Sequence, residues 1–165
     1  MKSMSRTTLA LAAVAALVVA VALFYLLGGP APSNLALGRA VTASASFESS
    51  SPASVLDGDP STVWNSGTFP PAWIEIDLGS TSRIESIGLI VEQTPAGPSV
   101  HTVSVATEAG HFTPVEVLSG ETFAGQELTV APGGAVRDAR FVRVETTSSG
   151  SWVAWREIEV WGTTR

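Results

Sequence analysis

Short segments in which apolar and polar residues alternate make up much of the chain after Ser33, and this pattern constrains the fold most strongly. Examples are Ile74/Ile76/Leu78, Val103/Val105, Val115/Val117 and Val142/Val144. A period of two is typical of β-strands with one buried face, and Gly and Pro between such segments are typical of turns. No long helical period follows Ser33. The sequence therefore predicts one all-β domain of roughly 130 residues, arranged as a sandwich or barrel.

The first thirty residues differ in kind from the rest of the chain. Lys2 and Arg6 precede an uncharged apolar run from Thr7 to Gly29. As a helix this run would be about 34 Å long, which exceeds the roughly 30 Å hydrocarbon core of a bilayer. A cleaved signal peptide has a shorter apolar core and a small-x-small cleavage site, and the best such site here, Ala31-Pro32-Ser33, contains proline. We therefore favour an uncleaved signal anchor over a cleaved signal peptide.

The basic residues before the apolar run predict its orientation, because positive charge tends to remain on the cytoplasmic side. We expect residues 1–6 in the cytoplasm, a transmembrane signal anchor at 7–29, a linker at 30–33 and the β domain at 34–162. The expected location is the cell membrane, with a single membrane pass and an extracytoplasmic C-terminal domain.

Charge and cysteine content exclude several classes of function for the part after Ser33. This part has seven arginines, no lysine and fifteen acidic residues, which gives a formal charge of −8. Nucleic acids and anionic lipids are bound by basic patches, so neither is an expected partner. The chain has no cysteine, so neither a disulfide nor thiol chemistry is available to it.

Residues with the chemistry needed for catalysis are few. The chain has neither a GxSxG nor an HExxH motif, and its two histidines are His101 and His111. His111 falls at an expected hairpin tip, where an exposed histidine without a role is the favoured interpretation. His101 opens an expected strand after a Pro/Gly loop, where it could face a ligand or be a satisfied strand-end histidine. No carboxylate pair has a glycosidase signature, and we predict that the protein is not an enzyme.

The segment before Trp64 contains two carboxylates, a glycine, a proline and two hydroxyls. The side chains that could provide oxygen ligands for a hard cation such as calcium are Asp57, Asp59 and Thr62, together with the distant Glu157. Their spacing is not that of an EF-hand. From these residues alone, an Asx-type turn with solvated aspartates is an equal alternative to a cation site.

Five blocks of the sequence resemble one known family in the same order. They are Asn34–Ser44, Asp57–Ser66, Trp73–Gly79, Arg140–Val144 and Arg156–Gly162. Together they resemble the discoidin domain, which is the coagulation-factor type C module and is akin to the family 32 carbohydrate-binding modules. The resemblance extends from Asn34 to Gly162 and implies a galactose-binding-like jelly-roll β-sandwich.

The resemblance also implies a structural calcium ion, held by the turn before Trp64 and by a glutamate near the C-terminus. Carried over residue by residue, its ligands would be the carbonyl of Ser54, the carboxylate of Asp57, a contact from Asp59, the carbonyl and hydroxyl of Thr62, and the carboxylate of Glu157. Trp64 itself would lie in the core.

Five tryptophans have to be divided between core and surface. Trp64, Trp73 and Trp161 lie in blocks where the family has buried aromatic or strand residues, so we expect them in the core. Trp152 follows a polar loop, and related modules bind sugars at such loops at one end of the sandwich. Its indole could stack on a pyranose, or it could cap the edge of the sandwich. Strand alternation predicts that Trp152 and Trp155 face opposite sides.

The other candidate ligand-binding residues lie in loops and at strand ends. They are Phe69, which could also stack on a sugar, and the polar residues Asn65, Glu92, Gln93 and His101. We interpret the chain as a membrane-anchored extracytoplasmic module that binds a carbohydrate or cell-surface glycan without catalysis. A protein–protein interaction module of an envelope assembly is the alternative. Phosphatidylserine is not an expected ligand, because apolar loop residues beside lysines, which membrane-binding relatives use, are absent from the sequence.

Overall fold

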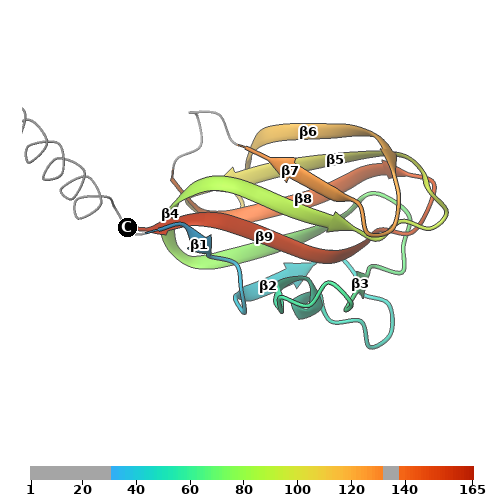
Figure 1. The fold of residues 1–165 in the computed structure, drawn as a ribbon, viewed down its shortest axis with the longest axis horizontal. Helices are drawn as coiled ribbons and strands as arrows, with labels where there is room; N and C mark the ends of the chain where they lie inside the picture. Colours follow the sequence, from blue (N-terminus) through green and yellow to red (C-terminus); the bar gives the residue numbers. More distant parts are fainter. Residues whose placement is uncertain (1–30, 132–137) are drawn as a thin grey trace, which may run out of the picture. The chain divides into compact units, whose positions relative to one another are not determined.

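The computed structural model describes residues 31–131 and 138–165 and shows an all-β fold, as predicted (Figure 1). These residues form nine strands and one short 3-10 helix, η1 (Pro52–Leu56). The strands are β1 (Ser33–Asn34), β2 (Ala40–Ala43), β3 (Trp64–Asn65), β4 (Ala72–Val91), β5 (Gly97–Ala106), β6 (Thr113–Thr122), β7 (Glu127–Val130), β8 (Ala139–Ser149) and β9 (Ala154–Thr164).

The long strand β4 joins the two layers of the fold. Up to Asp77 it pairs with β2 and β8, whereas from Ser82 onward it pairs mainly with β9 and β7. The register shifts between Asp77 and Ser82, and Gly79 between them has a φ of +84°, a left-handed conformation that favours glycine. One hydrogen-bonded sheet thus turns back on itself, with β5 and β6 extending the first layer beyond β8. The result is a β-sandwich.

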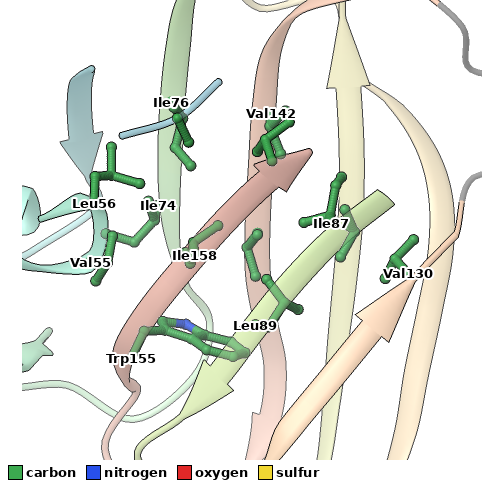
Figure 2. Packing of buried hydrophobic residues seen from close by; sticks show 14 of the residues in the cluster. Val55, Leu56, Ile74, Ile76, Ile87, Leu89, Val130, Val142, Trp155 and Ile158 are labelled. Atoms are coloured by element: carbon green, nitrogen blue, oxygen red, sulfur yellow. The ribbon is translucent and has the colours of Figure 1, made fainter. Parts of the chain in front are cut away.

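The core lies between these two layers and consists of alternate residues of their strands (Figure 2). Ile74 and Ile76 point inward from the first half of β4, and Ile87 and Leu89 point inward from its second half. A fully buried side chain of this kind contributes roughly 1.5–3 kcal/mol relative to an exposed one. The alternation in the sequence is therefore explained by burial of one face of each strand. Val117 is an exception. It is exposed on β6, which is the last strand at one edge of the sheet.

Two tryptophans are fully buried and adjacent. Trp64 of β3 pairs with Trp155 of β9, which confirms the prediction that Trp64 lies in the core. Trp152 is 41% exposed, so the predicted opposite orientation of Trp152 and Trp155 is also confirmed.

The prediction that Trp73 and Trp161 lie in the core is not upheld. Trp161 is 38% exposed, because it alternates along β9 with the buried Val160 and points to the outer face. Trp73 is half-buried on the outer side of β4, and the guanidinium of Arg143 lies 4.7 Å from the centre of its ring. Both indoles belong to the outer faces of strands whose other faces supply the core.

The first and last strands of the domain are neighbours. Ser33 pairs with Gly162 and Asn34 pairs with Trp161, so the chain enters and leaves the domain at the same edge (Figure 1). Pro32–Arg165 form one compact unit. The expected cytoplasmic segment 1–6 and signal anchor 7–29 lie outside the described residues. Within 31–131 and 138–165, no helix is long and apolar enough to cross a membrane.

Candidate functional site

A hollow of about 330 Å³ lies where three loops meet at one end of the sandwich. It is lined by Asn65, Phe69, Glu92, Thr94, Pro95, Gly150, Ser151, Trp152 and Ala154. The structure thereby brings together four of the candidate ligand-binding residues, which come from segments far apart in the sequence. These four are Asn65, Phe69, Glu92 and Trp152.

Backbone hydrogen bonds hold the loops of this hollow in register. The Ser66 amide donates to the Val153 carbonyl at 2.9 Å, and the Val153 amide donates to the Thr68 carbonyl at 3.0 Å. The Glu92 amide donates to the Ala154 carbonyl at 3.2 Å. The segment after Trp152 is therefore tied to the segment after Trp64 and to Glu92, and the side chains of the hollow are preorganised.

Exposed aromatic side chains border the hollow. Phe69 is 60% exposed, and the exposed ring of Phe47 lies with its centre 5.4 Å from that of Trp152, at an angle of 50°. Sequence reasoning did not identify Phe47. A Cβ at Gly67 would lie 2.9 Å from the Cβ of Phe47, so the glycine allows this close approach. The sequence signal that could have identified Phe47 is a large aromatic residue within the polar stretch 44–51.

The electrostatic character of the hollow depends on Glu92, which among the described residues is the only ionisable one that lines it. The Glu92 carboxylate accepts a hydrogen bond from Nε of Arg156 and forms an ion pair with it. The side-chain carbonyl of Asn65 accepts a hydrogen bond from the Gly67 amide at 2.8 Å. The hollow thus combines flat apolar surfaces with a neutralised carboxylate, an arrangement suited to a polar ligand with apolar faces.

The turn before Trp64 gathers the five residues expected at the calcium site. The Thr62 hydroxyl lies 3.0 Å from the Ser54 carbonyl, from Oδ2 of Asp57 and from the Asp59 carbonyl. Oε1 of Glu157 accepts a hydrogen bond from the Gly58 amide at 3.2 Å, so β9 reaches this turn. The Asp59 carboxylate instead accepts hydrogen bonds from Ser61, which lower its pKa.

Glu157 provides a test of whether these residues suit a cation. Its side chain is 2% exposed, and Oε2 is buried without a hydrogen-bond partner. Burial, together with repulsion from Asp57, Glu159 and Asp59, raises the pKa of Glu157 to about 7. No three His, Cys, Asp or Glu side chains cluster as a metal site among the described residues. A cation here would therefore need carbonyl and hydroxyl oxygens as well as carboxylates, which suits a hard ion such as calcium.

A family model for the F5/8 type C domain matches residues 40–158 of the chain. The chain belongs to the F5/8 type C, or discoidin, family. This result confirms the resemblance drawn from the five sequence blocks. Among curated proteins, none matches the chain.

Solved structures similar to this discoidin domain include carbohydrate-binding modules. Chitosan-binding module 1 from a chitosanase/glucanase of Paenibacillus sp. IK-5 is 29% identical, with a TM-score of 0.68 over 79% of this chain and 99% of that chain. The family 32 module of C. perfringens NanJ, solved with galactose, is 15% identical, with a TM-score of 0.67 over 79% of this chain and 98% of that chain. The second likeness shows the fold alone.

His101 lies inside the discoidin domain and does not line the loop hollow. It is the fifth residue of β5 and faces inward, with Nε2 2.8 Å from the Ser99 hydroxyl and Nδ1 3.0 Å from the Thr146 hydroxyl. Gln93 is also buried, and its side-chain carbonyl accepts a hydrogen bond from the Thr122 hydroxyl at 2.7 Å. The structure therefore differs from the expectation that His101 and Gln93 face a ligand. His111, in contrast, is exposed between β5 and β6, as predicted.

Burial lowers the pKa of His101 to about 4 from its ordinary value of 6.5. Between these two values the unfolded chain binds a proton at this residue and the folded domain does not, so lowering the pH favours unfolding. We expect this contribution to be fully present above pH 6.5 and to be lost as the pH falls toward 4. Between pH 7 and pH 5 it should lower the free energy of unfolding by about 2 kcal/mol.

Urea unfolding of the wild type and the His101→Gln variant at both pH values would measure this contribution. The variant should lose less stability than the wild type on acidification, because it has no imidazole to protonate. His111→Gln, which replaces the exposed histidine, is the matched control and should behave like the wild type. An identical pH dependence in wild type and His101→Gln would contradict the assignment.

Proposed function

We propose that this domain binds a carbohydrate at the loop hollow without changing it chemically. The observation that carries the proposal is the exposed indole of Trp152, set beside Phe47 and Phe69 at the rim of a hollow that contains polar groups. An indole can stack on the apolar face of a pyranose while neighbouring polar groups bind its hydroxyls. Membership of a family related to carbohydrate-binding modules supports the same function.

The composition of the hollow supports binding rather than hydrolysis. Glycosidases generally use two carboxyl groups on either side of the scissile bond, one of them with a raised pKa. Within the part of the chain that the structure describes, Glu92 is the only carboxylate that lines this hollow, and Arg156 holds it in an ion pair. A ligand would therefore meet a single carboxylate that is already engaged.

The charge of the domain favours a neutral or amine-bearing sugar. The chain after Ser33 has a formal charge of −8, which would repel an anionic glycan. The neighbour at 29% identity is described as chitosan-binding, and the neighbour at 15% identity was solved with galactose. Chitosan and galactose, the ligands of these two neighbours, are both compatible with a neutral or amine-bearing sugar.

Replacement of Trp152 by alanine tests the stacking platform. We expect it to weaken binding to the best ligand from a glycan array by at least about 2 kcal/mol, roughly 30-fold, because a central aromatic anchor is lost. The free energy of unfolding should change by less than about 1 kcal/mol, since the indole is largely a surface group. Titration calorimetry and urea unfolding give the two quantities.

The matched control is Phe123→Ala, which removes an exposed aromatic that does not line the hollow. It should leave glycan binding unchanged. Loss of about 3–5 kcal/mol of stability in Trp152→Ala would identify the residue as core and contradict the proposal. Unchanged glycan binding in that variant would contradict it equally.

We also propose that the turn before Trp64 holds a structural calcium ion. The carboxylates of Asp57 and Glu157, the hydroxyl of Thr62 and the carbonyls of Ser54 and Thr62 would hold it, with Asp59 contributing a contact. The bound cation would supply a positive charge next to the buried Glu157 carboxylate. The unpaired Oε2 of Glu157 supports the proposal, because a buried carboxylate without a partner is otherwise costly.

Calcium at about one hundred times its dissociation constant should stabilise the folded domain by about 2.7 kcal/mol if it binds the folded state alone. The melting temperature should therefore rise with calcium and fall with a chelator. Asp57→Ala and Glu157→Gln should abolish this response. Glu108→Gln, in the exposed loop after β5, should retain it. A wild-type melting temperature that is indifferent to both calcium and chelator would contradict the site.

The apolar run at residues 7–29 supports a further proposal, that a signal anchor holds the domain on the outer side of the cell membrane. The full-length chain should remain in the membrane fraction after a carbonate wash and should retain its N-terminus. Arginine at Val18 should disfavour insertion by about 2.5–3.5 kcal/mol, whereas leucine there should not. A mature soluble product that begins near Asn34 would contradict the anchor.

A further inference from the structure

A second hollow, of about 290 Å³, lies away from the loop hollow on the outer face of β9, β4 and β7. Strand pairing aligns its residues in rows across these strands. Gly88 of β4 is opposite Glu159 of β9 on one side and opposite Thr129 of β7 on the other, and Ser86 is opposite Trp161. We call this feature the outer-face hollow. Its volume is close to that of the loop hollow and near the lower end of the range for small-molecule sites, roughly 300 Å³.

The hollow exists because small residues lie between larger ones. Ile87 and Leu89 point into the core, so the intervening Ser86 and Gly88 present the outer face of β4. A Cβ at Gly88 would lie 3.3 Å from Oε2 of Glu159, so that carboxylate extends across the glycine backbone. The floor at Gly88 is therefore bare backbone, with Ile90 of the same face on one side of it and Ser86, opposite Trp161, on the other.

Trp161 and Glu159 hold one another in place. The indole Nε1 donates a hydrogen bond to Oε2 of Glu159 at 2.9 Å. The indole plane and the carboxylate are thus oriented before any ligand arrives, which reduces the entropy that binding must overcome. Glu127 provides a second carboxylate at the other side of the hollow.

The charge of this hollow differs from that of the loop hollow. Glu92 in the loop hollow is neutralised by Arg156, whereas neither Glu159 nor Glu127 forms an ion pair within residues 31–131 and 138–165. The residues that line the outer-face hollow include no arginine, lysine or histidine. It is therefore an acidic site with a flat aromatic wall and hydroxyl groups.

We propose that the outer-face hollow is a second binding site, specific for an amine-bearing hexopyranose such as a glucosamine residue. The Trp161 indole stacks on the apolar face of the ring and its negative face also attracts a cation. Glu159 and Glu127 attract the ammonium group, and the hydroxyls of Ser86 and Thr129 are available to those of the sugar. This site goes beyond the proposed function and does not depend on Trp152.

The test uses the full-length chain in mild detergent with the Trp152→Ala substitution, so that failure of the loop hollow cannot be confused with failure of this site. The probe is a hexamer of β-1,4-linked glucosamine, titrated by calorimetry while the Trp161 indole N–H is followed by NMR. The indole resonance should shift on titration, and the hexamer of N-acetylglucosamine should bind at least tenfold more weakly because its nitrogens are uncharged amides.

Three further substitutions, each added to Trp152→Ala, separate the features of the site. Trp161→Ala removes the wall, Glu159→Gln removes a charge, and Gly88→Val fills the floor and displaces the Glu159 carboxylate from it. Each should weaken binding of the glucosamine hexamer at least tenfold. Glu159→Gln should also make this binding less dependent on the salt concentration. Phe123→Ala is the control and should leave binding unchanged.

Several outcomes would overturn the proposal. Loss of all binding in Trp152→Ala would place the glucosamine hexamer in the loop hollow. An unmoved Trp161 resonance, or equal affinity with and without Trp161, would exclude the outer-face hollow. Equally tight binding of spermine at this site would show a general cation site rather than one for a sugar.

Discussion

The pairing of β4 with both layers is the constraint on which the remainder of this domain depends. Its first half fixes β8, and through β8 the strands β5 and β6, while its second half fixes β9 and β7. The strand ends at Val91, so the next residue, Glu92, is delivered directly to the loop hollow. The same strand supplies Ser86 and Gly88 to the outer face. Both hollows are thus positioned by one continuous segment of backbone.

One short part of β9 contributes to three different environments. Arg156 neutralises Glu92 at the loop hollow, Glu157 is buried against the turn before Trp64, and Glu159 lies on the outer face beside Trp161. The register of β9 against β4 shifts at Arg156, between the Ile90–Glu157 and Val91–Trp155 pairs, whereas Glu157 and Glu159 are in regular register and share one side of the strand. Glu157 and Glu159 therefore differ in accessibility, because the turn before Trp64 packs against Glu157.

Much of the fold could be predicted from the sequence, because a period of two directly reports burial of one strand face. The loop positions of Phe69 and Trp152 also indicated that both side chains lie at the surface. The expectation that His101 faces a ligand came from its place beside a Pro/Gly loop, whereas His101 shares the strand parity of the buried Val103 and faces inward with it. Phe47 was missed because its proximity to Trp152 depends on tertiary contacts, including the close approach to Gly67. Family blocks indicated where strands lie, but did not show that Trp161 faces outward.

Because the first and last strands are neighbours, a force on the ends of the domain would act along a defined direction. β9 runs from Ala154 beside the loop hollow to Thr164 near the chain entry, so the hollow and the entry lie at opposite ends of one strand (Figure 1). A pull between a ligand in the hollow and an attachment at the N-terminus would load β1 against β9 in shear. β1 has only two residues, but the Asn34 side chain also accepts hydrogen bonds from the amides of Ala36 and Val160. This asparagine therefore strengthens the contact between β1 and β9, which is the first contact that a force on the N-terminus would load.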